Sequence, residues 1–179
     1  MTKKIILLHG KARSGKDCFY DTVIKAGYDV EKIMFAEPMK KMAQTFFNIS
    51  PEELEKTKDQ MHEFGCTPRK YLQQLGDLGK ELCGPDVWTK IAINKINESE
   101  KNIIIITDCR FIQELELIKA NFDCTSIKVI REGQDRIETN GHASEAGLSN
   151  NLFDLLIKHN SNWPEYKNIV LDIMKNLKK

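Results

Sequence analysis

The 179-residue sequence predicts an α/β protein of three layers, α/β/α, in which helices cover both faces of a five-stranded parallel sheet. Two observations carry this prediction. Short apolar runs of strand length alternate with longer amphipathic segments along the chain. One run contains four consecutive isoleucines, which suits a central parallel strand that is buried on both faces. The strands are expected over 4–9, 32–36, 102–107, 126–131 and 153–158.

The helices are expected between these strands, and capping residues mark several of their starts. Pro38 opens a helix that continues to Phe47, and Ser50 caps the polar segment that follows. Thr67, followed by proline, opens a helix that reaches Leu82. Further helices begin near 85–88, 111 and 163–164. Because parallel strands end at one edge of a sheet, polar groups after the strands are expected in one crevice: 10–18, 37–40, 108–110 and the segment after 131.

The composition is that of an ordinary globular protein. Charged residues make up 30%, hydrophobic residues 41%, and the net charge is +1, so no global field favours nucleic acid or a membrane surface. No apolar run approaches the length of a membrane span, and the N-terminus does not follow the signal-peptide pattern. The five cysteines form no zinc or disulfide pattern. We therefore expect one domain with reduced thiols in the cytoplasm, which would be the host cytoplasm if the source is viral.

A glycine-framed loop follows the first predicted strand. Gly10, Gly15 and Lys16 give the spacing G-x-x-x-x-G-K, and a helix is expected directly after them. The loop amides and the helix N-terminus point at a common centre, which suits phosphate, and Lys16 can reach the outer phosphates. Asp17 stands where Ser or Thr usually supplies a hydroxyl for magnesium. The alternative is a chance glycine-rich turn.

Asp108 and Arg110 follow the isoleucine-rich strand. The carboxylate can hold magnesium, directly or through water, and the guanidinium can grip a phosphate. Alternatively, Asp108 caps the helix at Phe111 and Arg110 is a surface residue. Glu114 lies one helical turn after Arg110, so these two side chains are able to pair.

Two other groups are weaker candidates. Arg69 and Gln73 share a helix face with Gly76, which favours a nucleotide-reading surface, although a solvated helix face has the same pattern. Gly76 and Gly79 would also let backbone or a ligand approach this helix closely. Trp88 is interpreted as a core residue or as a stacking platform for a base. The segment after Arg131 favours an arginine-bearing loop that closes over phosphates, although it also fits an ordinary polar loop.

The motifs together resemble the deoxynucleoside monophosphate kinases of bacteriophages and large DNA viruses, in which Asp also replaces the Ser or Thr of the phosphate loop. The resemblance runs in order through nearly the whole chain. It rests on segments 10–17, 37–40, 67–76, 87–88 and 107–110 with Glu114, then Arg131 with Gly133, and 142–148. It implies a P-loop NTPase-type kinase domain over 1–179, an insertion near the acceptor site over about 50–65, and a lid loop over about 132–143. The implied reaction moves the γ-phosphate of ATP, with Mg²⁺, onto a deoxynucleoside 5′-monophosphate.

The resemblance also implies roles for individual residues. The catalytic set is Lys16, Arg13, Asp108, Arg110 and Arg136. The ATP phosphates would contact Lys11, Ala12, Arg13, Ser14, Gly15, Lys16, Asp17 and Cys18. The acceptor nucleotide would contact Met39, Lys40, Arg69, Gln73, Gly76, Asp77, Trp88, Asp108, Arg110 and Glu114. The lid would carry Arg131, Arg136 and His142, and the metal would lie at Asp17 and Asp108.

Two departures from this family pattern stand out. Cys18 replaces the Thr that usually follows the Asp, and the insertion is shortened to about 50–65, so no base preference carries over.

Two alternative functions stay open. Phosphomevalonate kinase of the animal type has a similar phosphate loop and Asp-x-Arg, but lacks the helix with Arg69, Gln73 and Gly76. The other alternative is a nucleotide-binding module without transfer. The expected partners are ATP and the monophosphate, with no nucleic acid or membrane, and a homodimer is left open.

Overall fold

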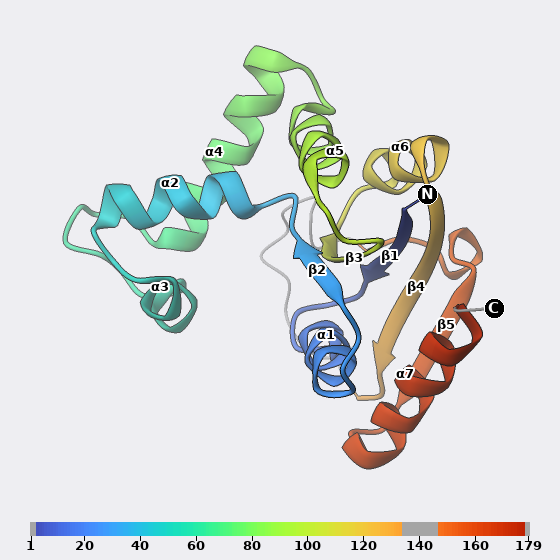
Figure 1. The fold of residues 1–179 in the computed structure, drawn as a ribbon. Helices are drawn as coiled ribbons and strands as arrows, with labels where there is room; N and C mark the ends of the chain where they lie inside the picture. Colours follow the sequence, from blue (N-terminus) through green and yellow to red (C-terminus); the bar gives the residue numbers. More distant parts are fainter. Residues whose placement is uncertain (1–2, 134–146, 178–179) are drawn as a thin grey trace. The chain divides into compact units, whose positions relative to one another are not determined.

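The structure is a computed structural model that describes residues 3–133 and 147–177. The chain divides into two compact units (Figure 1). The first consists of Met1–Met34 and Ile93–Lys179, and the second of Phe35–Ala92. The single kinase domain over 1–179 stays a prediction, as do the insertion and the lid.

The first unit is built on a five-stranded parallel sheet, as the sequence predicts. The strands follow the order β2-β3-β1-β4-β5, so the N-terminal strand lies in the centre, between the third and the fourth. The register pairs Ile6 with Ile105 on one side and with Thr125 on the other. The strands are β1 (Lys4–His9), β2 (Val30–Ile33), β3 (Ile103–Cys109), β4 (Asp123–Arg131) and β5 (Leu155–His159).

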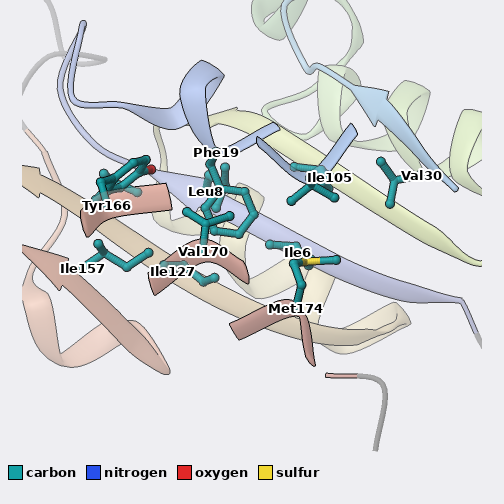
Figure 2. Close-up of a cluster of buried hydrophobic side chains, with 12 residues drawn as sticks. Ile6, Leu8, Phe19, Val30, Ile105, Ile127, Ile157, Tyr166, Val170 and Met174 are labelled. Atoms are coloured by element: carbon teal, nitrogen blue, oxygen red, sulfur yellow. The ribbon is translucent and has the colours of Figure 1, made fainter. Parts of the chain in front are cut away.

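Helices cover both faces of this sheet. On one face, α1 (Lys16–Lys25) and α7 (Trp163–Leu177) pack with strand residues into a fully apolar cluster (Figure 2). Phe19 and Val170 from the helices are completely buried there, together with Leu8 and Ile127 from the strands. Strand side chains alternate between faces, and the alternate residues over 5–7 and 104–106 are buried too, so the opposite face is also covered. Helix α6 (Ile112–Asn121) lies on that face, with buried Leu115 and Ile118.

Most predicted elements are confirmed, with shifted ends. The strand predicted over 32–36 lies nearer the N-terminus: β2 ends at Ile33, where its pairing with β3 ends. Phe35 belongs to the same apolar run of the sequence, and it is buried although it lies beyond the end of the strand. Strand β3 runs on to Cys109 and therefore contains Asp108. The five cysteines are free, as expected.

The second unit is helical. It holds α2 (Glu37–Phe47), α3 (Pro51–Thr57), α4 (Pro68–Cys83) and the first half of α5 (Val87–Glu98). The predicted caps are confirmed: the Ser50 hydroxyl accepts from the Glu53 amide at 3.1 Å, and Thr67 accepts from Lys70 at 3.2 Å. Ala43, Phe47 and Leu54 form the buried centre of this unit. In the described residues, no helix is both long and apolar enough to cross a membrane.

Candidate active site

The parallel sheet brings four polar chain segments to the edge at which its strands end. The loop over 10–15 leaves β1, Asp108 and Arg110 lie at the end of β3, Arg131 ends β4, and His159 ends β5. The sequence predicts the first three at one edge, and the sheet confirms this. His159 was not among the predicted site residues.

The loop between β1 and α1 has a backbone that depends on its two glycines. A Cβ on Gly10 would lie 2.4 Å from the Val129 carbonyl oxygen and 2.5 Å from the Ser14 hydroxyl. Gly15, the N-cap of α1, has φ +109°, a value that side chains disfavour. Arg13, at the exposed tip, also takes a left-handed conformation with φ +60°. Such local strain is common at ligand-binding loops.

Lys16 folds back into this loop. Its Nζ donates to the carbonyl oxygens of Gly10 and Lys11, both at 2.7 Å, and to the Ser14 hydroxyl at 3.3 Å. Only 8% of the residue is exposed. The carbonyl oxygens hold the ammonium group in place where the loop turns, so the loop combines backbone amides with a positioned lysine.

The rear of the loop is held by side chains from the C-terminal part of the chain. His159 Nε2 lies 2.8 Å from the Ser14 carbonyl oxygen, and the Tyr166 hydroxyl donates to the Gly15 carbonyl oxygen at 2.9 Å. The rings of Trp163 and Tyr166 cross edge to face with centroids 5.8 Å apart. No local sequence signal points to these contacts, because 145 and 151 positions separate the hydrogen-bonded partners.

The end of β3 is shaped by Glu114. Its carboxylate accepts from the backbone amides of Arg110 at 2.6 Å and Phe111 at 3.0 Å, and thereby caps the start of α6. The capping role that the sequence offered to Asp108 at this helix is thus filled by Glu114. Asp108 and Arg110 are both half-buried at the strand end.

His9 and Lys128 lie beside the loop, and sequence reasoning missed both. His9 Nδ1 lies 2.9 Å from the Cys109 carbonyl oxygen, and Nε2 accepts from the Leu148 amide at 3.2 Å. Lys128 donates to the Leu148 carbonyl oxygen, and its Nζ lies 5.9 Å from the centre of the Phe153 ring. Burial, with smaller effects from Lys128 and Lys16, lowers the pKa of His9 to about 4, so the ring is neutral at pH 7. It therefore holds the chain at Leu148 without adding charge.

The other residues predicted for the phosphate site and the lid are exposed or half-buried where the structure describes them. Lys11 and Ala12 are exposed, and Cys18 is half-buried, with its sulfur 4.0 Å from the Thr22 hydroxyl. Asp17 forms an ion pair with Lys32 at 2.7 Å, and the Asp17 side chain is 81% exposed.

Of the predicted lid residues, the structure describes Arg131. It donates from Nε to the Ser161 hydroxyl at 2.8 Å and lies over the Trp163 ring. Arg136 and His142 lie outside the described residues.

The acceptor-side candidates of the second unit fall into two groups. Met39, Gly76 and Trp88 come together: the indole donates to the Gly76 carbonyl oxygen at 2.9 Å, and a Cβ on Gly76 would lie 3.2 Å from the Met39 sulfur. Only 8% of Trp88 is exposed, which favours its interpretation as a core residue. Gln73 is half-buried on the same helix, and Asp77 is exposed.

The second group consists of two cations, each of which faces an acidic residue. Lys40 pairs with Glu55 at 2.6 Å, and Arg69 forms a two-pronged pair with Asp59, in which Nη2 lies 3.1 Å from Oδ2. Burial alone would raise the pKa of Glu55, but hydrogen bonds from Lys40 and Lys58 lower it to about 2. A phosphate that binds either cation competes with a carboxylate.

Three comparisons with known proteins identify the family. A family model for deoxynucleotide monophosphate kinase matches residues 51–170. The chain is 28% identical to a protein of Acanthamoeba polyphaga mimivirus that is provisionally named a deoxynucleotide monophosphate kinase, over 96% of both chains. It is 29% identical to the deoxynucleoside-5′-monophosphate kinase of Escherichia phage T5 over 56% of this chain, but only 43% of that protein.

The fold has a counterpart among solved structures. The crystal structure of TT1252 from Thermus thermophilus superposes with a TM-score of 0.57 over 99% of both chains, at 10% identity. At that identity the likeness concerns the fold alone, and it agrees with the parallel α/β architecture described above. The family match covers more than half of the sequence, so this chain belongs to the deoxynucleotide monophosphate kinase family.

Proposed function

We propose that this protein is an enzyme that transfers the γ-phosphate of ATP to a deoxynucleoside 5′-monophosphate and so contributes to dNTP supply. The observation that carries the proposal is the loop between β1 and α1, with its buried Lys16 and a glycine at its helix N-cap. Phosphoryl transfer depends mainly on positioning and on neutralising charge, and this loop is built for both. Family membership supports the nucleotide as acceptor, and neither phosphomevalonate nor binding without transfer is favoured.

On the donor side, we assign the ATP phosphates to the backbone over 11–18 and to the Lys16 ammonium. Lys16 Nζ lies against two carbonyl oxygens, and an incoming phosphate oxygen offers it a charged acceptor in their place. Arg13 stands at the exposed tip, where its guanidinium can follow the transferred group. Because Lys16 stabilises charge that grows as the phosphoryl group moves, its contribution is largest in the transition state.

We assign Mg²⁺ to Asp17 and Asp108, which suit its preference for one or two carboxylates alongside phosphate oxygens and water. Within residues 3–133 and 147–177, no group of three or more His, Cys, Asp or Glu side chains could hold a metal ion. In the proposed site, phosphate oxygens and water would complete the coordination. Cys18 offers soft sulfur, which is a poor magnesium ligand. When bound, the metal neutralises charge on the phosphates. The Asp17 carboxylate reaches it only by leaving Lys32, which costs little at an exposed pair.

On the acceptor side, we assign the monophosphate to Lys40, Arg69 and Arg110, with Gln73 near the base. The lid residues Arg131, Arg136 and His142 complete the proposal on the grounds of the family resemblance. Glu114 would act on the backbone at Arg110, which it fixes by hydrogen bonds.

We further propose that the enzyme works in the cytoplasm on free nucleotides, with no nucleic acid or membrane partner. A homodimer stays open.

A coupled assay of ADP release tests the proposal directly. The acceptors are dTMP, dGMP, dCMP, dAMP and (R)-5-phosphomevalonate, each with ATP and Mg²⁺. We expect ADP release with at least one of the four nucleotides, together with the matching diphosphate in chromatography. Turnover of phosphomevalonate alone would contradict the assignment of a nucleotide as acceptor. ATP binding without turnover of any acceptor would favour the non-catalytic alternative.

A further inference from the structure

The phosphate loop rests against three ring side chains from the far end of the chain. His159 ends β5, and Trp163 and Tyr166 lie in the first turn of α7. A Cβ on Gly15 would lie 3.3 Å from His159 Nε2 and from Tyr166 Cζ, and 3.4 Å from Trp163. The His159 and Tyr166 rings are themselves in contact, with centroids 4.6 Å apart. The loop backbone thus lies directly on this group.

Two of the three rings also donate hydrogen bonds to loop carbonyl oxygens. His159 Nδ1 accepts from the Ser161 amide at 3.3 Å, so the ring N–H is at Nε2. Nε2 then donates to the Ser14 carbonyl oxygen at 2.8 Å. The Tyr166 hydroxyl donates to the Gly15 carbonyl oxygen at 2.9 Å, beside the first bond of α1 from the Phe19 amide. His159 and Tyr166 are 6% and 0% exposed, so water does not replace these donors readily.

The planarity of the peptide bond transmits these contacts to the other side of the loop. In a trans peptide the C=O and the following N–H point in opposite directions. The bond from His159 to the Ser14 carbonyl therefore aims the Gly15 amide away from His159. The bond from Tyr166 to the Gly15 carbonyl likewise aims the Lys16 amide away from Tyr166. These two amides stand at the start of α1, where a phosphate oxygen is best received.

We infer that His159 and Tyr166 are positioning residues for the phosphate groups of ATP, acting through the Ser14–Gly15 and Gly15–Lys16 peptides. This inference rests on the proposed use of ATP. Neither side chain needs to touch the nucleotide, because its hydrogen bond orients a donor that does. Fixing these amides before the ligand arrives removes an ordering cost from binding. The positive φ at Arg13 makes such outside support valuable, since this non-glycine residue holds a disfavoured backbone conformation.

Three variants separate this role from simple packing. Tyr166→Phe keeps the ring and removes the hydroxyl. His159→Phe keeps a ring and removes the donor, whereas His159→Gln keeps an N–H donor at about the reach of Nε2. Tyr28→Phe is the matched control, because Tyr28 is a half-buried tyrosine that packs against the same core cluster.

The measurement is the dissociation constant of ATP with Mg²⁺, determined by calorimetry without any acceptor, alongside thermal unfolding. We expect Tyr166→Phe and His159→Phe each to weaken ATP binding by about 2- to 10-fold, the range that one neutral hydrogen bond supplies. His159→Gln is expected to recover most of the affinity that His159→Phe loses. Tyr28→Phe should bind like the wild type, even if its unfolding temperature falls as much as that of Tyr166→Phe.

Several results would overturn the inference. Wild-type ATP affinity in both Tyr166→Phe and His159→Phe would show that these donors do not prepare the phosphate site. An equal loss in His159→Gln and His159→Phe would assign the effect to ring packing. If Tyr166→Phe does not fold, the His159 pair alone decides the question. Because no acceptor is present, a chain that binds ATP but phosphorylates no nucleotide fails the proposed function and leaves this test intact.

Discussion

Lys16 illustrates what a spacing rule can and cannot predict about a single residue. The G-x-x-x-x-G-K pattern correctly predicts a loop between a strand and a helix with this lysine at the helix start. The side chain's partners, the carbonyl oxygens of Gly10 and Lys11, depend on the folded loop. Its buried ammonium lies against the loop backbone that a phosphate would meet, which makes it the first residue to test.

Lys16→Ala should abolish turnover. The substitution removes a charge that stabilises the transferring phosphoryl group, a loss on the order of several kcal/mol, so kcat/KM should fall by at least about 100-fold. The ADP-release assay with the preferred nucleotide measures this. Lys25→Ala, in the exposed last turn of the same helix, is the control and should keep wild-type turnover. Near-normal activity of Lys16→Ala would remove this side chain from the mechanism.

His9 is a residue whose role the sequence does not reveal. A histidine at the end of an apolar strand could be exposed or buried, and only the fold stacks it on Phe153 at a centroid distance of 5.0 Å. Burial lowers its pKa from the ordinary 6.5 to about 4. Between these two pH values the unfolded chain binds more protons than the folded one, so the free energy of unfolding falls as the pH falls. Above pH 6.5 this contribution is fully present.

His9→Asn should therefore flatten the dependence of thermal stability on pH between 6.5 and 5. Each pKa unit corresponds to about 1.4 kcal/mol, so the wild type should lose on the order of 2 kcal/mol across this interval because of His9. Carboxylates with a lowered pKa, such as Glu55 and Asp154, lose their contributions only at lower pH. Unfolding temperatures by circular dichroism provide the measurement, and His62→Asn is the control. An unchanged slope in His9→Asn would show that this imidazole is not the titrating group.

At the scale of elements, helix α4 explains two glycines that the sequence marks as places of close approach. Trp88 of α5 occupies the space beside Gly79, where a Cβ would lie 2.2 Å from an indole carbon. Its N–H also bonds the Gly76 carbonyl oxygen. The glycine pattern predicts close contact correctly, but it does not say whether backbone, side chain or ligand makes that contact. The partner at Gly79 is a side chain of the next helix.

Gly79→Ala should destabilise the second unit, whereas Gly76→Ala should be nearly neutral. Alanine gains about 1 kcal/mol of helix propensity at either position. At Gly79, overpacking against a rigid indole costs about 1–3 kcal/mol and outweighs that gain. At Gly76, the nearest atom is the sulfur of the flexible Met39 side chain at 3.2 Å, which can move aside. Urea unfolding followed by tryptophan fluorescence compares the two variants, and equal stability would contradict the packing of α4 on Trp88.

At the scale of the whole molecule, the sequence predicts the number and parallel direction of the strands but not their order. Local periodicity identifies an apolar strand, yet which strand pairs with which depends on the crossovers. Strand β1 pairs with β3 and β4, whose partner residues lie about a hundred positions away in the chain. The same dependence on long-range packing explains which site residues the sequence predicts and which it does not. Lys16 and Asp108 carry local signals, whereas His159 and Tyr166 become visible only when β5 and α7 are placed against the loop.

The division into two units leads to a prediction about the two substrates. The proposed ATP contacts, residues 11–18, all belong to the first unit, whereas Lys40, Arg69 and Gln73 belong to the second. Arg69→Ala removes a fork-shaped cation from the second unit and leaves the phosphate loop unaltered. The KM of the monophosphate should therefore rise by about 10-fold or more, the worth of a charged hydrogen bond, while the KM of ATP changes by less than about twofold.

Steady-state kinetics with each substrate varied in turn gives both constants. Lys70→Ala is the control: this neighbouring lysine of α4 is exposed, and both KM values should stay at the wild-type level. Arg69 is held by Asp59 in the free protein, so Asp59→Asn should lower the KM of the monophosphate by releasing the guanidinium. If Arg69→Ala raises both KM values equally, the Arg69 helix does not form the acceptor site, and the acceptor phosphate must be assigned to Arg110 in the first unit.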